Sequence, residues 1–430
     1  MLKPRQKIFF GWWIVAGALI LDLYIGGTFS IGFTAFFKPL VDEFGWSYFA
    51  VSLAASIRGI ESGIGSPVAG FLADRYGPRR IALVGVSIMG LGFILLSYTH
   101  SLTMFYISFA VMAIGSSGAS GVVMMTAVSN WFEKKISRAM GFMVAGYGAG
   151  GIMLVLVVWL INSYGWRNAL LVLGISTWVV CLPAALLLRH KPEQYGYLPD
   201  GKQPDNSPPP ASVQGTAVAK PAEVKSNNVE LSPGEALKSS AFWLISLSMS
   251  VRLLMANAVG LHVMPYLIGI GFSLGVAATV AASTALISIV GRIGFGWLGD
   301  MMDKRKVIAI AYGLLGLGML AFVYANTGWA LVLFVVAFGV GNGGTVPLRA
   351  SIQREYFGRS AFGSIQGLII AAMTAGGVIG PALAGWIYDS TGSYTTAWLS
   401  FAALAGLAIP MILLTRRPVK QLNGIKKALY

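Results

Sequence analysis

The side chains that could do chemistry in this chain are a few charged groups set inside long apolar stretches. Arg292 is the clearest case, because it stands in ALISIVGRIGFGW (285–297) with no acidic residue within seven positions on either side. A charge at the centre of a bilayer costs roughly 2.5–3.5 kcal/mol on insertion scales, so it needs a polar partner, a water-filled cavity or a ligand. A planar guanidinium suits a two-pronged, hydrogen-bonded ion pair with a carboxylate. Arg292 therefore indicates a binding site for a small organic anion, and the alternative is a structural pin between helices.

Four further ionisable side chains stand at similar depths in apolar stretches: Asp22, Arg58, Glu61 and Arg252. Arg58 and Glu61 are three residues apart, so they share a helix face and form either a structural pair or part of a proton-coupling site. Arg252 is a second contact for the anion, a counter-charge to Asp22, or a partner for backbone carbonyls. Asp22 is either a proton-coupling group, since burial raises a carboxyl pKa, or a fixed ion pair with an arginine.

Several uncharged groups are weaker candidates for the same site. Asn257, Tyr24, Tyr147 and Tyr266 could line a substrate cavity, or they could serve helix packing and interface anchoring. His262 is a proton-coupling candidate whose alternative is an interfacial histidine near a helix end. The three histidines and the single cysteine are too scattered for a metal cluster, and we expect no metal and no cofactor.

The composition shows which elements must position these groups. Of the 430 residues, 56% are hydrophobic and 11% are charged, whereas a soluble domain carries about 25% charged residues. Apolar stretches near the ~20 residues that a membrane-spanning helix needs recur along the chain. We therefore predict an all-α integral membrane protein with twelve spans. They lie at about 10–37, 47–73, 81–99, 102–130, 138–163, 166–190, 241–268, 274–299, 307–326, 329–348, 361–388 and 393–415.

Between the sixth and seventh spans lies a segment rich in Pro, Ser, Lys and Glu, which predicts a flexible cytoplasmic linker over 191–240. It separates an N-terminal six-helix bundle, 1–190, from a C-terminal bundle with a cytoplasmic tail, 241–430. With both termini inside, 26 of the 31 basic residues, Arg349 and Arg354 among them, fall in inner segments and two fall outside. This asymmetry follows the positive-inside rule for a multi-pass cell-membrane protein, and it explains the net charge of +15 without nucleic acid.

The two predicted bundles are copies of each other. GFLAD at 70–74 recurs as GWLGD at 296–300, an offset of 226, and Gly115 and Gly341 are related by the same offset. Both copies begin on the same side of the membrane, so these are parallel repeats related by an axis along the membrane normal. Such a pair encloses a midplane cavity that opens alternately to either side.

Residues 70–80, GFLADRYGPRR, fit the pattern G-x-x-x-D-R/K-x-G-x-R/K-R/K at every position, between the second and third spans. The chain resembles the major facilitator superfamily in this motif and in its six-plus-six layout. The resemblance implies that the motif latches the cytoplasmic ends of the second and eleventh helices. The gating residues it indicates are Gly70, Asp74, Arg75, Gly77, Arg79, Arg80 and, in the decayed second copy, Asp300.

The stretch WFEKKISRAMGFMVAGYGAGG at 131–151 is similar to the start of the fifth helix in the monocarboxylate transporter and oxalate:formate antiporter families. The resemblance implies that Arg292 binds the substrate carboxylate. Two features depart from those families: Ser288 replaces the aspartate of animal monocarboxylate carriers, and the eleventh span lacks a base between Arg359 and its outer end.

These observations together predict a monomeric secondary transporter that moves a small carboxylate, with a proton, through the lipid membrane by alternating access. Rival interpretations are an organic-anion exchanger of the oxalate:formate type, an efflux carrier for a hydrophobic compound, and a non-transporting membrane sensor. An enzyme is not expected, because no reactive constellation of residues is present.

Overall fold

The computed structural model describes residues 9–46, 48–119, 121–201 and 230–418, without the side chains of 48–49, 52–62 and 274. The regular elements in these ranges are helices. The first half contains α1 (Gly11–Ile25), the π-helical η1 (Gly26–Ile31), the 3-10 turn η2 (Gly32–Phe36), α2 (Phe37–Phe44), α3 (Tyr48–Tyr76), α4 (Pro78–Ser97), α5 (Leu102–Gly118), α6 (Gly121–Trp131), α7 (Ile136–Ala149), α8 (Gly151–Ser176), η3 (Thr177–Cys181) and α9 (Leu182–Leu186).

The second half has fewer and longer helices. Two short 3-10 turns, η4 (Pro192–Tyr195) and η5 (Pro199–Gly201), come before it. It contains α10 (Pro233–Lys238), α11 (Ser240–Gly269), α12 (Leu274–Met301), α13 (Lys304–Val323), α14 (Gly328–Phe357), α15 (Phe362–Thr391) and α16 (Thr395–Leu413).

The prediction of an all-helical fold with twelve spans is confirmed. Ten stretches of the described residues are long and apolar enough to cross a membrane. One of them, 136–186, contains two spans, because Gly165 has a φ of 79° and interrupts the helix there. The 29 residues of α3 form the remaining span. Most predicted boundaries fall within a few residues of the observed helix ends, although α14 runs nine residues beyond the predicted end of its span.

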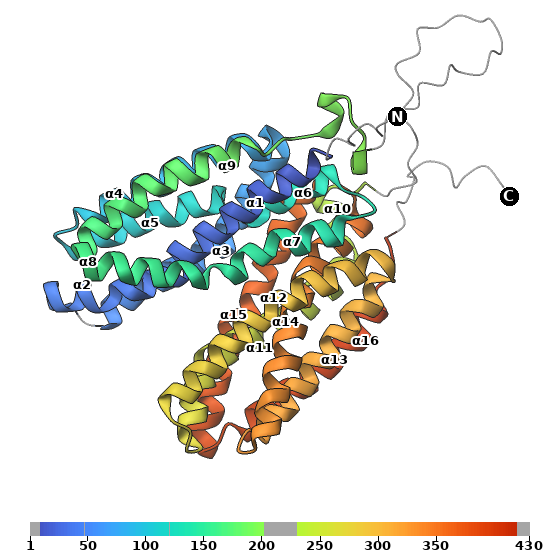
Figure 1. The fold of residues 1–430 in the computed structure, drawn as a ribbon. Helices are drawn as coiled ribbons and strands as arrows, with labels where there is room; N and C mark the ends of the chain where they lie inside the picture. Colours follow the sequence, from blue (N-terminus) through green and yellow to red (C-terminus); the bar gives the residue numbers. More distant parts are fainter. Residues whose placement is uncertain (1–8, 47, 120, 202–229, 419–430) are drawn as a thin grey trace, which may run out of the picture.

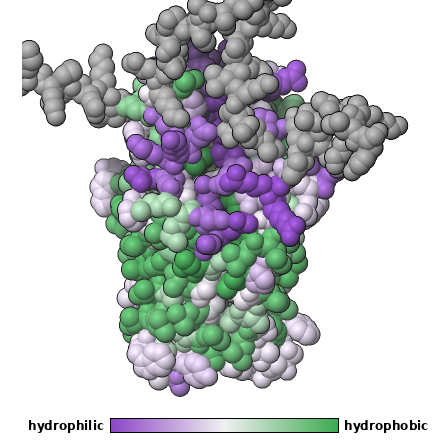
Figure 2. All heavy atoms as spheres, turned by 90° about the vertical axis from the view of Figure 1, so that its right-hand side faces the viewer, coloured by the Kyte–Doolittle hydropathy of each residue, from purple (hydrophilic) through white to green (hydrophobic). Residues whose placement is uncertain are grey.

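The helices form two bundles, each with its own apolar core. Figure 1 shows the first bundle in blue to green and the second in yellow to red, joined near the end of the molecule that carries both termini and diverging toward the other end. We call the end with the termini the termini side. Figure 2 shows hydrophilic side chains gathered on the termini side above a broad hydrophobic band. A hydrophobic band on the outer surface is expected where side chains face lipid rather than water.

The predicted linker contains short helical elements in the structure, and one predicted loop belongs to a helix. Of the segment 191–240, the structure describes 191–201 and 230–240, where 3-10 turns and α10 with its capping box form, and 202–229 lie outside the described residues. Arg349 and Arg354 were assigned to an inner loop, and this assignment is wrong. Both lie inside α14, each 8% exposed, because this helix continues through polar residues that pack between the bundles.

Candidate functional site

The two bundles touch along helix pairs that cross between them, α7 with α12 and α3 with α15. At the first crossing, a Cβ built at Gly141 would lie 2.5 Å from the carbonyl oxygen of Arg292. Only glycine lets the backbones of α7 and α12 approach this closely. The backbone of Arg292 is thereby fixed against the opposite bundle.

The side chain of Arg292 reaches across this interface to the first bundle. Its Nη1 donates to the carbonyl oxygen of Val144 in α7, and its Cζ lies 5.7 Å from the centroid of the Tyr147 ring. The guanidinium also interacts electrostatically with Asp22 in α1. Its Nε has no hydrogen-bond partner among the described residues, and the side chain keeps partial exposure. The group therefore has donor capacity to spare in a place where bundles meet.

Asp22 and Tyr147 frame this guanidinium from the first bundle. Asp22 lies in the last turn of α1, just before η1, and is only half-buried. A Cβ built at Gly26 would lie 2.7 Å from Cδ2 of Tyr147, so the Tyr147 ring packs where α1 passes into η1. The ring face beside a guanidinium is a cation–π arrangement, which stabilises the cation without neutralising it. Asp22, Tyr147 and Arg292 thus form one site from three helices.

Arg252 lies in α11 and is 8% exposed. Its Nη1 donates to Oδ1 of Asn342 in α14 at 2.9 Å. It also interacts electrostatically with Arg292, so two cations share this region of the interior. Asn342 was not among the sequence candidates, although Asn257, a comparable amide in an apolar helix, was. Its amide oxygen holds Arg252 without cancelling the charge.

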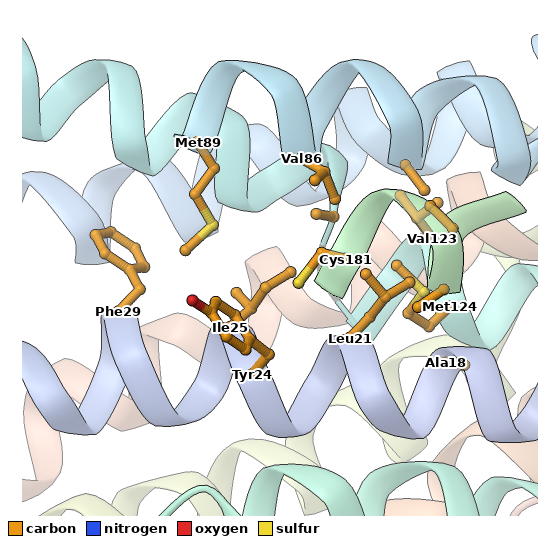
Figure 3. Close-up of a cluster of buried hydrophobic side chains, with 14 of the residues drawn as sticks. Ala18, Leu21, Tyr24, Ile25, Phe29, Val86, Met89, Val123, Met124 and Cys181 are labelled. Atoms are coloured by element: carbon orange, nitrogen blue, oxygen red, sulfur yellow. The ribbon is translucent and has the colours of Figure 1, made fainter. Parts of the chain in front are cut away.

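Two predicted lining residues, Tyr24 and Tyr266, lie elsewhere. Tyr24 points into the core of the first bundle, toward Met89 and Cys181 (Figure 3), and its hydroxyl bonds Ser176 at 2.5 Å. Tyr266 is equally internal to the second bundle, where its hydroxyl donates to the carbonyl oxygen of Phe322 at 2.9 Å. Both are held by their own bundles, away from Arg292.

Asn257 and His262 also bond within the second bundle. The amide nitrogen of Asn257 donates to the carbonyl oxygen of Gly377 at 2.9 Å. His262 Nε2 lies 3.0 Å from the carbonyl oxygen of Pro381, and Nδ1 lies 3.0 Å from the Tyr394 hydroxyl. A carbonyl can only accept, so Nε2 donates to the carbonyl oxygen of Pro381.

Both ring nitrogens of His262 thus have partners within the second bundle. The remaining proton-coupling candidates, Arg58 and Glu61, have side chains outside the described set.

The predicted gating motif joins the bundles on the termini side. Asp74, near the end of α3, accepts hydrogen bonds from the backbone N–H of Gly363 at 2.9 Å and from that of Ser364 at 2.7 Å, and also from the Ser364 hydroxyl at 2.8 Å. These N–H groups belong to the first turn of α15, where unsatisfied donors and the helix dipole favour an anion. A Cβ built at Gly70 would lie 2.0 Å from the carbonyl oxygen of Gly363, so no side chain fits there.

A second latch has the same design on the other side of the interface. Asp300, near the end of α12, accepts from the backbone N–H of Ser137 at 2.8 Å and from that of Arg138 at 3.0 Å, at the start of α7. The offset of 226 relates Asp74 to Asp300 and also Ser137 to Gly363. That repeated offset could have indicated the partner residues Ser137 and Arg138, which the sequence reasoning missed.

The other motif residues have local roles. Gly77 has a φ of 89° and precedes α4, a conformation that L side chains rarely adopt. The Arg75 guanidinium lies 5.5 Å from the centroid of the Tyr76 ring. Arg79 and Arg80 are exposed on the termini side. The contacts between the bundles at this motif are thus made by Asp74 and Gly70.

Comparisons with known proteins agree with this geometry. The model of the Major Facilitator Superfamily matches residues 9–328 and again 270–428. The chain belongs to this superfamily. Solved superfamily structures share the fold: the transporter FucP in the outward conformation has a TM-score of 0.70 at 15% identity over 94% of this chain and 100% of that one. The human organic anion transporter MFSD10 (TETRAN) has a TM-score of 0.69 at 12% identity over 94% and 98%.

Among characterised superfamily members, the chain is similar to monocarboxylate transporters. It is 27% identical to monocarboxylate transporter 13 of Rattus norvegicus over 93% of this chain and 88% of the relative. It is 26% identical to monocarboxylate transporter 12 of Xenopus laevis over 97% and 90%. This facilitator is therefore a multi-pass membrane transporter of a small molecule, related to the monocarboxylate transporters, and its relatives are transporters rather than enzymes.

Proposed function

We propose that this facilitator carries a small monocarboxylate across the cell membrane as a monomer, with Arg292 as the residue that holds the carboxylate. The observation that carries the proposal is the side chain of Arg292 at the bundle interface, with an unpartnered Nε and partial exposure. A carboxylate can accept two parallel hydrogen bonds from a guanidinium edge. The names of the similar proteins, and the neutral partners Tyr147 and Val144, favour the same ligand class.

We assign the termini side to the cytoplasm, as the positive-inside rule requires. Arg79, Arg80 and Lys134 are exposed there. At the opposite end, Lys38 lies 2.7 Å from Asp42 and Arg167 lies 2.6 Å from Glu43, so each base has an acid beside it. The latches of Asp74 and Asp300 then close the cytoplasmic side, and the bundles open toward the exterior. Alternating access requires both latches to break before the carboxylate is released inside.

Proton symport is the coupling that we favour, with Asp22 as the proton carrier. Asp22 is half-buried and interacts electrostatically with Arg292, so a carboxylate bound at Arg292 would compete with Asp22 for the same cation. Protonation of Asp22 removes that competition, and substrate and proton then bind together. Under this scheme Asp22→Asn retains exchange of labelled monocarboxylate but loses accumulation driven by a pH gradient. An anion exchanger would show no accumulation driven by a pH gradient, either in the wild type or in Asp22→Asn.

Counterflow in proteoliposomes tests the proposal. Liposomes loaded with acetate, lactate, pyruvate or butyrate are diluted into the labelled compound, and transient uptake against the gradient is measured. We expect counterflow with at least one of the four, and a loss of about 10- to 100-fold in Arg292→Lys, because a lysine cannot form the two-pronged pair. Arg305→Lys is the matched control: it lies in an exposed ion pair with Asp303, and should retain wild-type rates.

Each rival function gives a different result in this assay. A non-transporting sensor shows no counterflow with any compound. In an efflux carrier for hydrophobic compounds, Arg292→Lys changes the rate of transport little. Wild-type counterflow by Arg292→Lys would remove this residue from the mechanism and overturn the proposal.

A further inference from the structure

A third buried arginine, Arg349, has no role in the site described so far. It lies eight residues before the end of α14, about 12 Å from the termini-side end of that helix. It is 8% exposed, and its side chain contacts Met125 of the first bundle. No ion pair joins it to a carboxylate of the described residues, although seven such pairs occur elsewhere in those residues.

The partners of Arg349 are neutral. Only one orientation of the Gln366 amide is compatible with its neighbours, and in it the Gln366 oxygen accepts from Nε at 3.1 Å and from Nη2 at 3.0 Å. Nη1 lies 3.3 Å from the sulfur of Met373, and Nη2 lies 3.8 Å from the sulfur of Met125. Thioether sulfur is a weak acceptor. One amide oxygen and two sulfurs therefore face a full positive charge.

Arg354, five residues further along α14, shows what a compensated arginine looks like in this interface. It is also 8% exposed, and its Nε donates to the carbonyl oxygen of Ser129 in the first bundle at 3.3 Å. It interacts electrostatically with the acidic residues Glu230, Glu133 and Asp200. Arg354 fits a structural role. Arg349 instead interacts electrostatically with another cation, Arg252, which makes its burial costlier.

Arg292, Arg252 and Arg349 form a row of cations across the second bundle. Arg252 interacts electrostatically with both of the others. Among the described residues, Asp22 is the acidic residue that interacts with this row, through Arg292. The row leads from the site at Arg292 toward the termini side, because Leu348, the residue before Arg349, packs against Gly299, which lies beyond Arg292 toward the termini-side end of α12. An excess of positive charge along this path favours an anion at each step.

We propose that Arg349 is a second anion-binding residue, which receives the carboxylate after it leaves Arg292, once the cytoplasmic side opens. This inference rests on the proposed function. Met125 belongs to the first bundle, whereas Gln366 and Met373 belong to the second. Separation of the bundles removes the Met125 sulfur from Arg349 and exposes the guanidinium, which keeps its orienting bonds to Gln366. The carboxylate then replaces Met125 as the partner.

The charge of the exposed site can be measured without knowing the substrate. Met125→Cys, in a Cys181→Ser background, places a single thiol beside Arg349. Inside-out vesicles are treated with an anionic methanethiosulfonate (sulfonatoethyl) or a cationic one (trimethylammonioethyl). We expect the thiol to react from the cytoplasmic side, with an anionic-to-cationic rate ratio at least about tenfold above that of a free thiol. Acetate, lactate, pyruvate or butyrate that supports counterflow should slow the reaction.

Substitutions at Arg349 test whether this residue causes the preference for the anionic reagent. Arg349→Gln should lower the rate ratio by about tenfold, Arg349→Lys should retain it, and Arg354→Gln is the matched control that should leave it unchanged. A thiol that never reacts from the cytoplasmic side, or a ratio equal to that of a free thiol in the chain with Arg349 intact, would overturn the inference. So would a ratio unchanged in Arg349→Gln. The proposed function fails separately, by the absence of Arg292-dependent counterflow.

Discussion

The two bundles have the same latch but different interiors. Asp74 of the first bundle binds the start of α15, and Asp300 of the second binds the start of α7, at positions related by one offset of 226. The charged interior does not follow this symmetry. The offset relates Arg292 to Ser66 and Arg349 to Val123, so neither cation has a charged counterpart in the first copy.

This difference separates two tasks of the fold. Closure is a property of both bundles, because each must grip a helix start of the other when the cytoplasmic side closes. Recognition of an anion needs an excess of positive charge at one site, whereas two identical bundles would each carry the same buried cations. The second bundle supplies the cations, and the first contributes Asp22 and the Tyr147 ring.

The largest effect is expected from locking the closed side. The hydroxyls of Ser137 in α7 and Ser351 in α14 are in direct contact across the interface. Ser137→Cys with Ser351→Cys, in the Cys181→Ser background, should form a disulfide under oxidation, abolish counterflow and recover under reductant. Each single-cysteine variant serves as its control. Full transport by a protein that is shown to be cross-linked would mean that this interface does not open.

A smaller effect should come from the glycines of the two latches. A Cβ built at Gly70 would lie 2.0 Å from the carbonyl oxygen of Gly363, and one at Gly296 would lie 2.7 Å from that of Ser137. Gly70→Ala should therefore impair cytoplasmic closure and reduce counterflow more than Gly296→Ala. Gly294→Ala, where a Cβ meets nothing within 4 Å, is the matched control. The reverse order of the first two variants would show that the latches are not matched as described.

The smallest effect should come from the latch carboxylates themselves. Asp74 accepts three hydrogen bonds across the interface and Asp300 accepts two from backbone N–H groups. Charge-assisted bonds contribute about 1.5–3 kcal/mol each at most, and water replaces part of the loss. In a protein with Ser351→Cys as its single cysteine, Asp74→Asn should raise the rate at which this thiol reacts from the cytoplasmic side by about tenfold. Asp300→Asn should raise that rate by less. Equal reaction rates of the Ser351→Cys thiol with and without each aspartate substitution would contradict a role of the carboxylates in closure.

Much of the fold followed from the sequence, because apolar length and the distribution of Lys and Arg are strong signals in membrane chains. Asp74 and Gly70 were selected as candidates for a similar reason: the motif they share has a fixed spacing. Arg292 was selected as a candidate because it stands alone among apolar residues. These positions are marked by local pattern, which a single chain displays.

The misses have a common cause. Arg349 follows the apolar part of α14 and precedes Gln353 and Arg354, so its neighbours in sequence are those of a loop, while its neighbours in space are Gln366, Met373 and Met125. Tyr24 was predicted either to line the cavity or to serve helix packing, and in the structure it packs in its own bundle. Helical rotation places it on another face of α1, toward the core of its own bundle (Figure 3). Which face of a helix meets the other bundle depends on tertiary packing.

The central claim is that a carboxylate binds at Arg292, and its most direct test is ligand-dependent thermal stability in the locked protein. In the oxidised Ser137→Cys and Ser351→Cys protein, with Cys181→Ser, the site at Arg349 stays closed and Arg292 alone can take an anion. We predict that acetate, lactate, pyruvate or butyrate raises the melting temperature, and that Arg292→Lys removes the increase at the same concentration. An equal increase with and without Arg292, or no increase with any of the four, would contradict the account.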